Sequence, residues 1–325
     1  MTPLVYIIIL NWNNTQDTMQ CLRSVGKLDY SNFRVIIADN GSQEDPRSIL
    51  NSAQTSFDLI ISPVNYGYTG GNNIAIRYAL QKKADYVWLL NNDTTFEPNT
   101  LSLLIDAMQE DSRLGMTSPV IRYHPSNDIE HAGEIIDIET ATFTGFSKLE
   151  QARKWQETNP ERVVLFGTAL LIRSELITKI GFFDEDFFAY WEDYDMSIRS
   201  NLAGYRNAVV FDTCIYHVKP SHLNPQHEEA RKPYFYYYMT RNEFILWRKH
   251  AKLHMQLKTA IWATLRVLKK TYRLKKHIKL SEACILGLWH GLSGRAGAYD
   301  PAWRIREPLR TIAHYSCVSI GRLIQ

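Results

Sequence analysis

Cysteine is scarce and scattered in this chain. Only Cys21, Cys214, Cys284 and Cys317 occur among 325 residues, and no two of them form a Cys-x-x-Cys pair. A zinc knuckle needs closely spaced cysteines and a disulfide scaffold needs many of them, so the sequence predicts neither. We therefore expect a protein of a reducing compartment.

Long apolar segments are also missing. The run Leu4–Leu10 has neither a basic leader nor a small-residue cleavage site. No stretch reaches the approximately 20 apolar residues that a helical membrane span requires. The sequence thus predicts no signal peptide and no membrane crossing, and we expect a cytoplasmic protein.

Two nucleotide-binding signatures are absent. The first β-rich run leads into Asn11-Trp12-Asn13-Asn14 without a G-x-G-x-x-G motif, which disfavours a dinucleotide-dependent dehydrogenase. A G-x-x-x-x-G-K-[ST] motif is also lacking, which disfavours a P-loop kinase or ATPase.

Acidic residues are absent from one basic segment. Between Phe244 and Ser281 there are eleven Lys or Arg residues and no Asp or Glu, so the rest of a chain whose net charge is +3 carries −8. On a helical wheel, six apolar residues of this segment fall within an arc of about 120°. These are Leu253, Leu257, Ile261, Leu265, Leu268 and Tyr272.

This pattern favours a helix that lies on an anionic membrane surface. A helix whose apolar arc packs on the rest of the protein stays open as the alternative. Nucleic acid is not predicted as a partner, because no recognised binding motif accompanies the charge.

What is present in the first half is an alternation of short β-rich runs with helix-like stretches. The runs are Leu4–Leu10, Phe33–Ala38, Leu59–Ile61 and Tyr86–Leu90, and each is followed by polar or glycine-rich residues. We predict an α/β fold with a mostly parallel central sheet flanked by helices. Ligands of such sheets bind outside the carboxyl ends of the strands, so the four polar loops predict one site.

The pattern becomes irregular and polar over residues 123–161. It predicts an insertion or a small antiparallel excursion, to which we assign no chemistry.

Three segments carry candidate functional side chains. A buried strand delivers Asn91-Asn92-Asp93 to the edge of the sheet, where Asp93 could bind a divalent cation or merely cap a turn. His217 follows another apolar run and is either a second metal ligand or structural. The glycine-rich segment Asn65–Asn73 opens a helix, whose N-terminus favours an anion such as a diphosphate.

The densest segment mixes acidic and aromatic residues from Phe182 to Asp195 and then enters a helix. Large rings seek burial, so we expect a cleft wall here and not a solvated face. Asp193, next to the aromatic residues, is the candidate general base. Asp195 is expected only to stabilise the helix start and to pair with Arg199.

Taken in order, these segments resemble family-2 inverting glycosyltransferases with a GT-A fold, particularly the bacterial rhamnosyl- and galactofuranosyltransferases. The matching stretches are Ile8–Asn13, Ile37–Ser42, Asn65–Asn73, Leu89–Pro98, Gly167–Arg173, Gly181–Tyr205, His217 and Arg241-Asn242. The resemblance implies transfer of a sugar, with dTDP-rhamnose favoured as donor, to a lipid-linked or cell-surface polysaccharide acceptor. It also implies a catalytic domain over 1–233 and a helical basic region over 234–325, for acceptor or membrane association on the inner face of the plasma membrane.

The resemblance also implies roles for individual residues. Trp12 and Asp39 would contact the pyrimidine base of the donor, and Gly70, Asn72 and Asn92 would line its binding site. Asp93 and His217 would hold Mn²⁺ or Mg²⁺, and Asp193 would be the base. Asn91 departs from the acidic residue that opens the family's D-x-D signature. A sugar nucleotidyltransferase and a nucleotide- or glycan-binding protein without activity stay open as alternatives.

Overall fold

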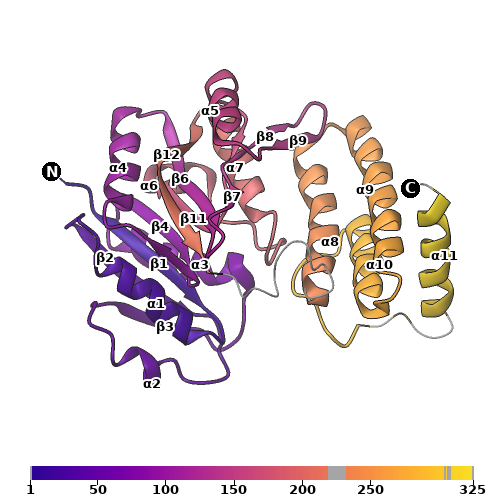
Figure 1. Cartoon of the computed structure of the whole chain (residues 1–325), viewed down its shortest axis with the longest axis horizontal. Coiled ribbons are helices and arrows are strands. Elements are labelled where there is room, and N and C mark those ends of the chain that lie inside the picture. The colour runs from indigo at the N-terminus through magenta and orange to yellow at the C-terminus, as the bar shows by residue number, and fades with distance from the viewer. Residues whose placement is uncertain (1, 219–231, 304, 306–308, 324–325) are drawn as a thin grey trace. The chain divides into compact units, whose positions relative to one another are not determined.

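The computed structural model describes residues 2–218, 232–303, 305 and 309–323 (Figure 1). They form two compact units. The first comprises Met1–Ile136, Phe143–Asp184 and Glu192–Lys219, and the second comprises Asp137–Thr142, Glu185–Trp191 and Pro220–Gln325.

A nine-stranded sheet forms the centre of the first unit. Its strands are β1 (Val5–Asn11), β2 (Phe33–Asp39), β3 (Asp58–Ile61), β4 (Tyr86–Asn91), β5 (Thr94–Phe96), β6 (Leu114–Tyr123), β7 (Ile129–His131), β11 (Ala169–Arg173) and β12 (Arg206–His217). They are ordered β3-β2-β1-β4-β11-β6-β12-β5, with β7 beside β6. Strands β3, β2, β1 and β4 are parallel, as are β6 and β12, whereas β11, β5 and β7 pair in antiparallel fashion. The predicted α/β class is confirmed, with a mixed sheet.

Helices cover both faces of this sheet. The first unit contains α1 (Thr15–Val25), α2 (Arg47–Leu50), α3 (Gly67–Gln81), α4 (Thr100–Glu110), α5 (Leu149–Thr158), α6 (Ser174–Ile180) and α7 (Glu192–Leu202). Side chains of β1 alternate between two cores, because successive strand residues point to opposite faces. Ile7 packs in the core that α1 and α4 cover, and Ile8 in the core that α3, α6 and α7 cover.

The irregular region after β6 contains a second, small sheet. Its strands are β8 (Glu134–Asp137), β9 (Thr142–Gly145) and β10 (Val163–Val164), in the order β10-β8-β9. Strands β10 and β8 pair in antiparallel fashion, which confirms the antiparallel excursion predicted for this segment.

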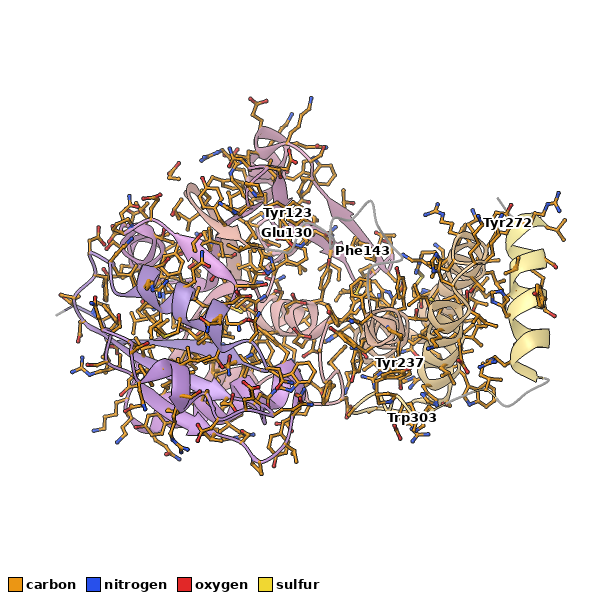
Figure 2. The ribbon with its side chains drawn as sticks, turned by 60° about the horizontal axis from the view of Figure 1, so that its bottom comes forward. Tyr123, Glu130, Phe143, Tyr237, Tyr272 and Trp303 are labelled. Carbon is orange, nitrogen blue, oxygen red and sulfur yellow. The ribbon has the colours of Figure 1, made fainter. Side chains whose placement is uncertain are left out.

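The second unit is helical. It contains α8 (Pro233–His250), α9 (Leu253–Arg273), α10 (Ile278–Ser293) and α11 (Leu309–Leu323). Helices α8 and α10 pack closely at Gly287. A Cβ atom at this position would lie 2.6 Å from the Tyr237 carbonyl oxygen, so only glycine leaves enough room. The rings of Tyr237 and Trp303 are 5.8 Å apart in the aromatic core of this unit (Figure 2). No helix among the described residues is both long and apolar enough to cross a bilayer.

A bend at Glu185–Trp191 also belongs to the second unit, and a buried Arg-Asn pair of α8 holds it. Phe188, Tyr190 and Trp191 have positive φ angles of 64°, 69° and 73°, which are costly for bulky side chains. The Asn242 side chain donates to the carbonyl oxygens of Phe187, Ala189 and Tyr190 at 2.9, 2.8 and 2.7 Å. Arg241 donates to the carbonyl oxygen of Phe187 at 2.8 Å. These bonds compensate for the strained backbone.

We expect Asn242→Ala to destabilise the protein. Asn242 is fully buried, so the substitution removes three buried hydrogen bonds from the bend and lowers the unfolding free energy by about 1–3 kcal/mol. Urea unfolding followed by tryptophan fluorescence measures the change. Asn99→Ala is the matched control, since Asn99 is exposed and its side chain makes no capping bond to α4. Equal stability of the two variants would contradict the role given to Asn242.

Candidate active site

The carboxyl ends of three parallel strands bring polar residues to one edge of the sheet. Asn11 at the end of β1 is in register with Asp39 of β2, and the preceding Leu10 is in register with Asn91 of β4. The Asn11 amide donates to Asp39 Oδ1 at 2.7 Å. The predicted convergence of these loops is therefore present in the structure.

Asp39 is almost completely buried, with 1% of its surface exposed. Besides the bond from Asn11, it accepts bonds from the hydroxyl of Ser42 at 2.6 Å and from its backbone N–H at 3.1 Å. These donors satisfy most of the acceptor capacity of a carboxylate. Trp12, which follows Asn11, is 46% exposed and offers its ring at the surface.

Asn92 is joined to Asp39 through a chain of hydrogen bonds. Its amide donates to Thr18 Oγ1 at 3.1 Å, and the Thr18 hydroxyl donates to Asn11 Oδ1 at 2.7 Å. Asn11 in turn bonds to Asp39. Thr18 and Asn11 are thus site residues to which sequence analysis assigned no role, because nothing local distinguishes them from residues of an ordinary helix and strand end.

Asp93 and His217 lie side by side. The Nε2 atom of His217 is 2.9 Å from Asp93 Oδ1, and the backbone N–H of Val218 donates to the Asp93 carbonyl oxygen at 2.7 Å. On the other side of the ring, Nδ1 is 2.8 Å from Glu130 Oε2. Glu130 belongs to β7, in the region to which we assigned no chemistry.

The pair Asp93 and His217 has the chemistry of a site for a divalent cation. A carboxylate oxygen and an imidazole nitrogen suit Mn²⁺ or Mg²⁺ whose other ligands are phosphate oxygens and water. The contact from Glu130 to Nδ1 orients the ring so that Nε2 faces Asp93, as outer carboxylates do for metal-binding histidines. Within the part of the chain that the structure describes, no group of three or more His, Cys, Asp or Glu residues could hold a metal by itself.

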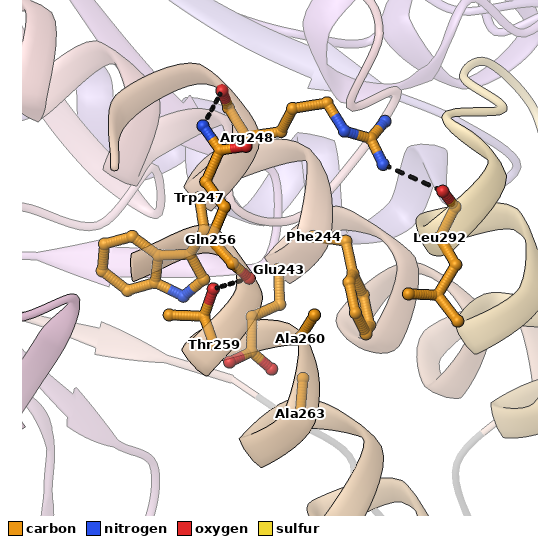
Figure 3. A pocket seen from close by; sticks show the side chains of 9 residues that line it. All are labelled: Glu243, Phe244, Trp247, Arg248, Gln256, Thr259, Ala260, Ala263 and Leu292. Atoms are coloured by element: carbon orange, nitrogen blue, oxygen red, sulfur yellow. Dashed lines mark hydrogen bonds between the residues drawn. The ribbon is translucent and has the colours of Figure 1, made fainter. Parts of the chain in front are cut away.

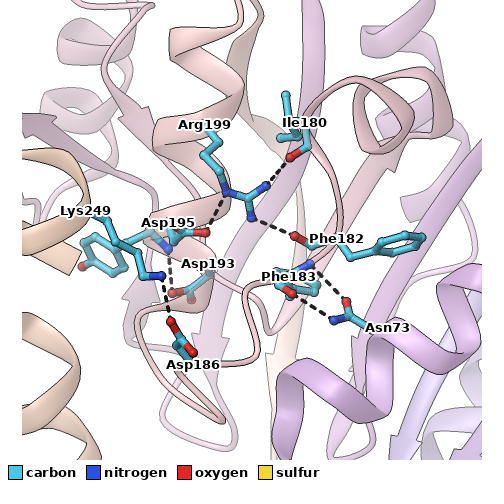
Figure 4. Close-up of polar contacts among 10 residues, drawn as sticks. Asn73, Ile180, Phe182, Phe183, Asp186, Asp193, Asp195, Arg199 and Lys249 are labelled. Carbon is cyan, nitrogen blue, oxygen red and sulfur yellow. Dashed lines mark hydrogen bonds and ion pairs between the residues drawn. The ribbon is translucent and has the colours of Figure 1, made fainter. Parts of the chain in front are cut away.

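Asp193 lies in the first turn of α7 and is half-buried (Figure 4). Its carboxylate accepts hydrogen bonds from the backbone N–H of Gly167 at 3.0 Å and of Tyr194 at 2.9 Å. Burial raises the pKa of Asp193 to about 6, although these N–H groups favour the charged form. A carboxylate with this pKa is a stronger base than an ordinary aspartate.

The dipeptide Gly167-Thr168 connects Asp193 with the end of β4. Gly167 donates to Asp193, and the carbonyl oxygen of Thr168 accepts from the backbone N–H of Asn91 at 2.9 Å. Asn91 is two residues before Asp93. The structure therefore brings the candidate base and the candidate metal ligands to one locality of the first unit.

The other acidic residues of this segment have different surroundings. Asp195 is buried and accepts from Arg199 Nε at 2.8 Å, which confirms the predicted ion pair. Glu192 is also buried, and burial together with the charge of Asp193 raises its pKa well above the ordinary value. Among these three, Asp193 is the least buried.

Gly70 and Asn72 are buried within α3. The Asn72 amide donates to the Tyr68 carbonyl oxygen of its own helix at 2.9 Å. Tyr68 of the same helix connects to the site, because its hydroxyl donates to the Gly167 carbonyl oxygen at 2.6 Å. A tyrosine in a glycine-rich helix start carries no local signal for such a contact.

Fold and site together define a glycosyltransferase of the GT-A class. Among solved structures, the chain is similar to the mannosyltransferase PcManGT from Pyrobaculum calidifontis in complex with GDP-Man and Mn²⁺. The TM-score is 0.58 at 15% identity, over 99% of this chain and 88% of that one. The chain belongs to glycosyl transferase family 2, whose model matches residues 6–181.

Two curated relatives are rhamnosyltransferases by name. The N-acetylglucosaminyl-diphospho-decaprenol L-rhamnosyltransferase of Mycobacterium tuberculosis is 23% identical over 71% of this chain and 83% of its own length. The dTDP-rhamnosyl transferase RfbF of Shigella flexneri is 22% identical over 91% of this chain and 98% of its own length.

Proposed function

We propose that this glycosyltransferase moves rhamnose from dTDP-rhamnose to a lipid-linked or polysaccharide acceptor, with inversion at the anomeric carbon and with Mn²⁺ or Mg²⁺. Both names support rhamnose as the sugar, the name of the Shigella flexneri relative supports dTDP-rhamnose as the donor, and the name of the Mycobacterium tuberculosis relative supports a lipid-linked acceptor. The observation that carries the proposal is the link through Gly167-Thr168 between Asp193 and the strand that ends beside Asp93.

Asp193 would act as the general base. In an inverting transfer the acceptor oxygen attacks the anomeric carbon from the side opposite the departing nucleotide, and it must lose its proton as the new C–O bond forms. A pKa of about 6 makes Asp193 a better proton acceptor than an ordinary aspartate while leaving it ionised at neutral pH.

Asp93 and His217 would hold the metal ion, which when bound neutralises the charge that grows on the leaving diphosphate. Glu130 keeps the imidazole of His217 oriented toward Asp93. Asp39 and the exposed ring of Trp12 would bind the pyrimidine base, with Asn92 supporting them through Thr18. Gly70 and Asn72 would shape the wall of the donor site from within α3.

The two parts of the chain would have different roles. Residues 1–233 would bind the donor and carry out the transfer, and residues 234–325 would meet the acceptor or the membrane that carries it. The protein would then work on the inner face of the plasma membrane. The basic segment that contains α9, with no acidic residue between Phe244 and Ser281, supports this location.

We expect the acidic limb of the pH profile of transfer to lie near pH 6. Asp193 accepts a proton only when ionised, and its pKa is raised to about 6, so kcat/KM should fall about tenfold for each pH unit below that value. Initial rates between about pH 5 and about pH 8 would measure the limb. A rate that stays constant down to about pH 5, as the ordinary aspartate pKa near 4 would give, would contradict the base role in this environment.

Incubation of the purified full chain with Mn²⁺ and a panel of nucleotide-sugars tests the proposed reaction. Slow metal-dependent hydrolysis of dTDP-rhamnose, and transfer when an acceptor is added, would support it. Release of diphosphate from a sugar phosphate and a nucleoside triphosphate would instead identify a nucleotidyltransferase. Metal-dependent binding of a nucleotide-sugar without turnover would identify a binding protein.

A further inference from the structure

An apolar row on α9 is exposed. Leu253, Leu257 and Ile261 are spaced four residues apart, which places them on one face of the helix, and they are 82%, 68% and 54% exposed. Trp262, beside Ile261, is 55% exposed. These four residues are called the α9 ridge. Four large apolar side chains this exposed on one helix indicate a surface that binds something.

The ridge is not the face by which α9 packs in the second unit. The buried side chains of α9 form a different row, which consists of Met255, Thr259, Ala263, Val267 and Thr271. A cavity of about 170 Å³ lies on this packed side, lined by α8, α9 and Leu292 (Figure 3). No ridge residue lines that cavity. The apolar arc predicted from the sequence is therefore exposed over its first half, whereas Leu265, Leu268 and Tyr272 of its second half are half-buried and α11 packs there through Gly321.

Basic residues border the ridge. His254, Lys258 and Arg266 lie in the row of the same helix that contains Trp262 of the ridge, and Lys258, Lys269 and Arg273 are exposed. Two of the nearby basic residues form ion pairs. Arg266 of α9 pairs with Glu243, and Lys252, which directly precedes α9, pairs with Glu139. The segment from Phe244 to Ser281 nonetheless keeps a large positive excess, with eleven basic residues and no acidic one.

We propose that the α9 ridge docks on an anionic lipid bilayer, with the leucine and isoleucine side chains among the acyl chains and the lysines at the headgroups. This inference rests on the proposed function and names the surface through which the enzyme meets its membrane. An amphipathic helix with apolar and cationic rows binds in this way, and tryptophan favours the same interfacial depth. Lys258 and Lys269 add attraction to anionic headgroups.

Two other occupants fit the surface less well. Nucleic acid would meet the positive charge but would leave Leu253 and Leu257 in water. A second copy of the chain would bury the apolar row, but a two-fold interface would also bring its basic row close to the same row of the partner. An anionic bilayer satisfies the apolar row and the charge together.

Co-sedimentation with vesicles tests the proposal. The full chain is mixed with phosphatidylcholine vesicles that contain about 30% phosphatidylglycerol, or none. We expect binding to the anionic vesicles only, and at least about a tenfold weaker partition for the double variant Leu257→Glu, Ile261→Glu. Circular dichroism verifies that this variant is folded. Leu202→Glu is the matched control and should bind as the unchanged chain does, because Leu202 is a 64% exposed leucine of α7 in the first unit.

Several outcomes would overturn the proposal. These are no binding to anionic vesicles, equal binding by the ridge variant, or binding to a short RNA that exceeds binding to vesicles. Conversion of a dimer to a monomer by the ridge variant, without vesicle binding, would make the ridge an interface between copies. Donor hydrolysis by the unchanged chain without vesicles is measured separately, so loss of docking and failure of the transferase assignment can be told apart.

Discussion

Asp193→Asn is expected to reduce sugar transfer by about 10²–10⁴-fold, the contribution of a positioned general base. The asparagine has nearly the same shape but cannot accept the proton of the acceptor hydroxyl. Affinity for the donor nucleotide should stay nearly unchanged, because no described contact joins Asp193 to Asp39 or Asn92 directly. Initial transfer rates and calorimetric titration with the free nucleoside diphosphate measure the two quantities.

Asp195→Asn is the matched control for this experiment. Asp195 lies on the same helix turn but is buried and paired with Arg199, so its loss should lower stability and leave the turnover of the folded fraction intact. If Asp193→Asn kept substantial transfer, Asp193 could not be the base. If Asp195→Asn abolished transfer in fully folded protein, the assignment of the two carboxylates would be reversed.

Asp93→Ala is expected to weaken Mn²⁺ binding by more than about 100-fold. Loss of a residue that only orients a metal ligand costs up to about 100-fold in metal affinity, and Asp93 is proposed to bind the ion directly. Of the proposed protein ligands only His217 would remain, and transfer should decline with the loss of the ion. Titration of Mn²⁺ in the presence of a nucleoside diphosphate, followed by electron paramagnetic resonance, measures the affinity without relying on activity.

Asp212→Ala is the control for the metal experiment. Asp212 lies on β12, the strand that carries His217, and its side chain is 78% exposed. It should therefore bind Mn²⁺ as the unchanged chain does. An Asp93→Ala variant with unchanged Mn²⁺ affinity would remove Asp93 from the metal site and would leave the contact between Asp93 and His217 as a structural one.

The strands of the first half and the place of the site were predictable from the sequence. Leu4–Leu10 and Tyr86–Leu90 are continuous apolar runs, typical of strands buried on both faces, and they correspond to β1 and β4. The polar residues that follow them had to meet at one edge, because parallel strands end on the same side. The ion pair of Asp195 and Arg199 was predictable for a similar reason, since helical spacing alone brings them together.

Contacts between distant segments were not predictable in this way. Glu130 and His217 are 87 positions apart, and only the pairing of β7 and β12 with β6 brings them into contact. The same holds for Tyr68 and Asp193, which both bond to Gly167. No periodicity or motif within either segment indicates such a partner.

The sequence by itself determined the elements of this protein and their polar ends, because apolar periodicity and turn chemistry act over a few neighbouring residues. It also determined that α9 is amphipathic and basic. Only the tertiary structure decided which face of α9 is buried, since small residues such as Ala263 allow close packing and left the larger Leu257 and Ile261 exposed. It alone also decided which two carboxylates contact His217 and how far burial raises the pKa of Asp193, because both depend on segments that meet only after the chain has folded.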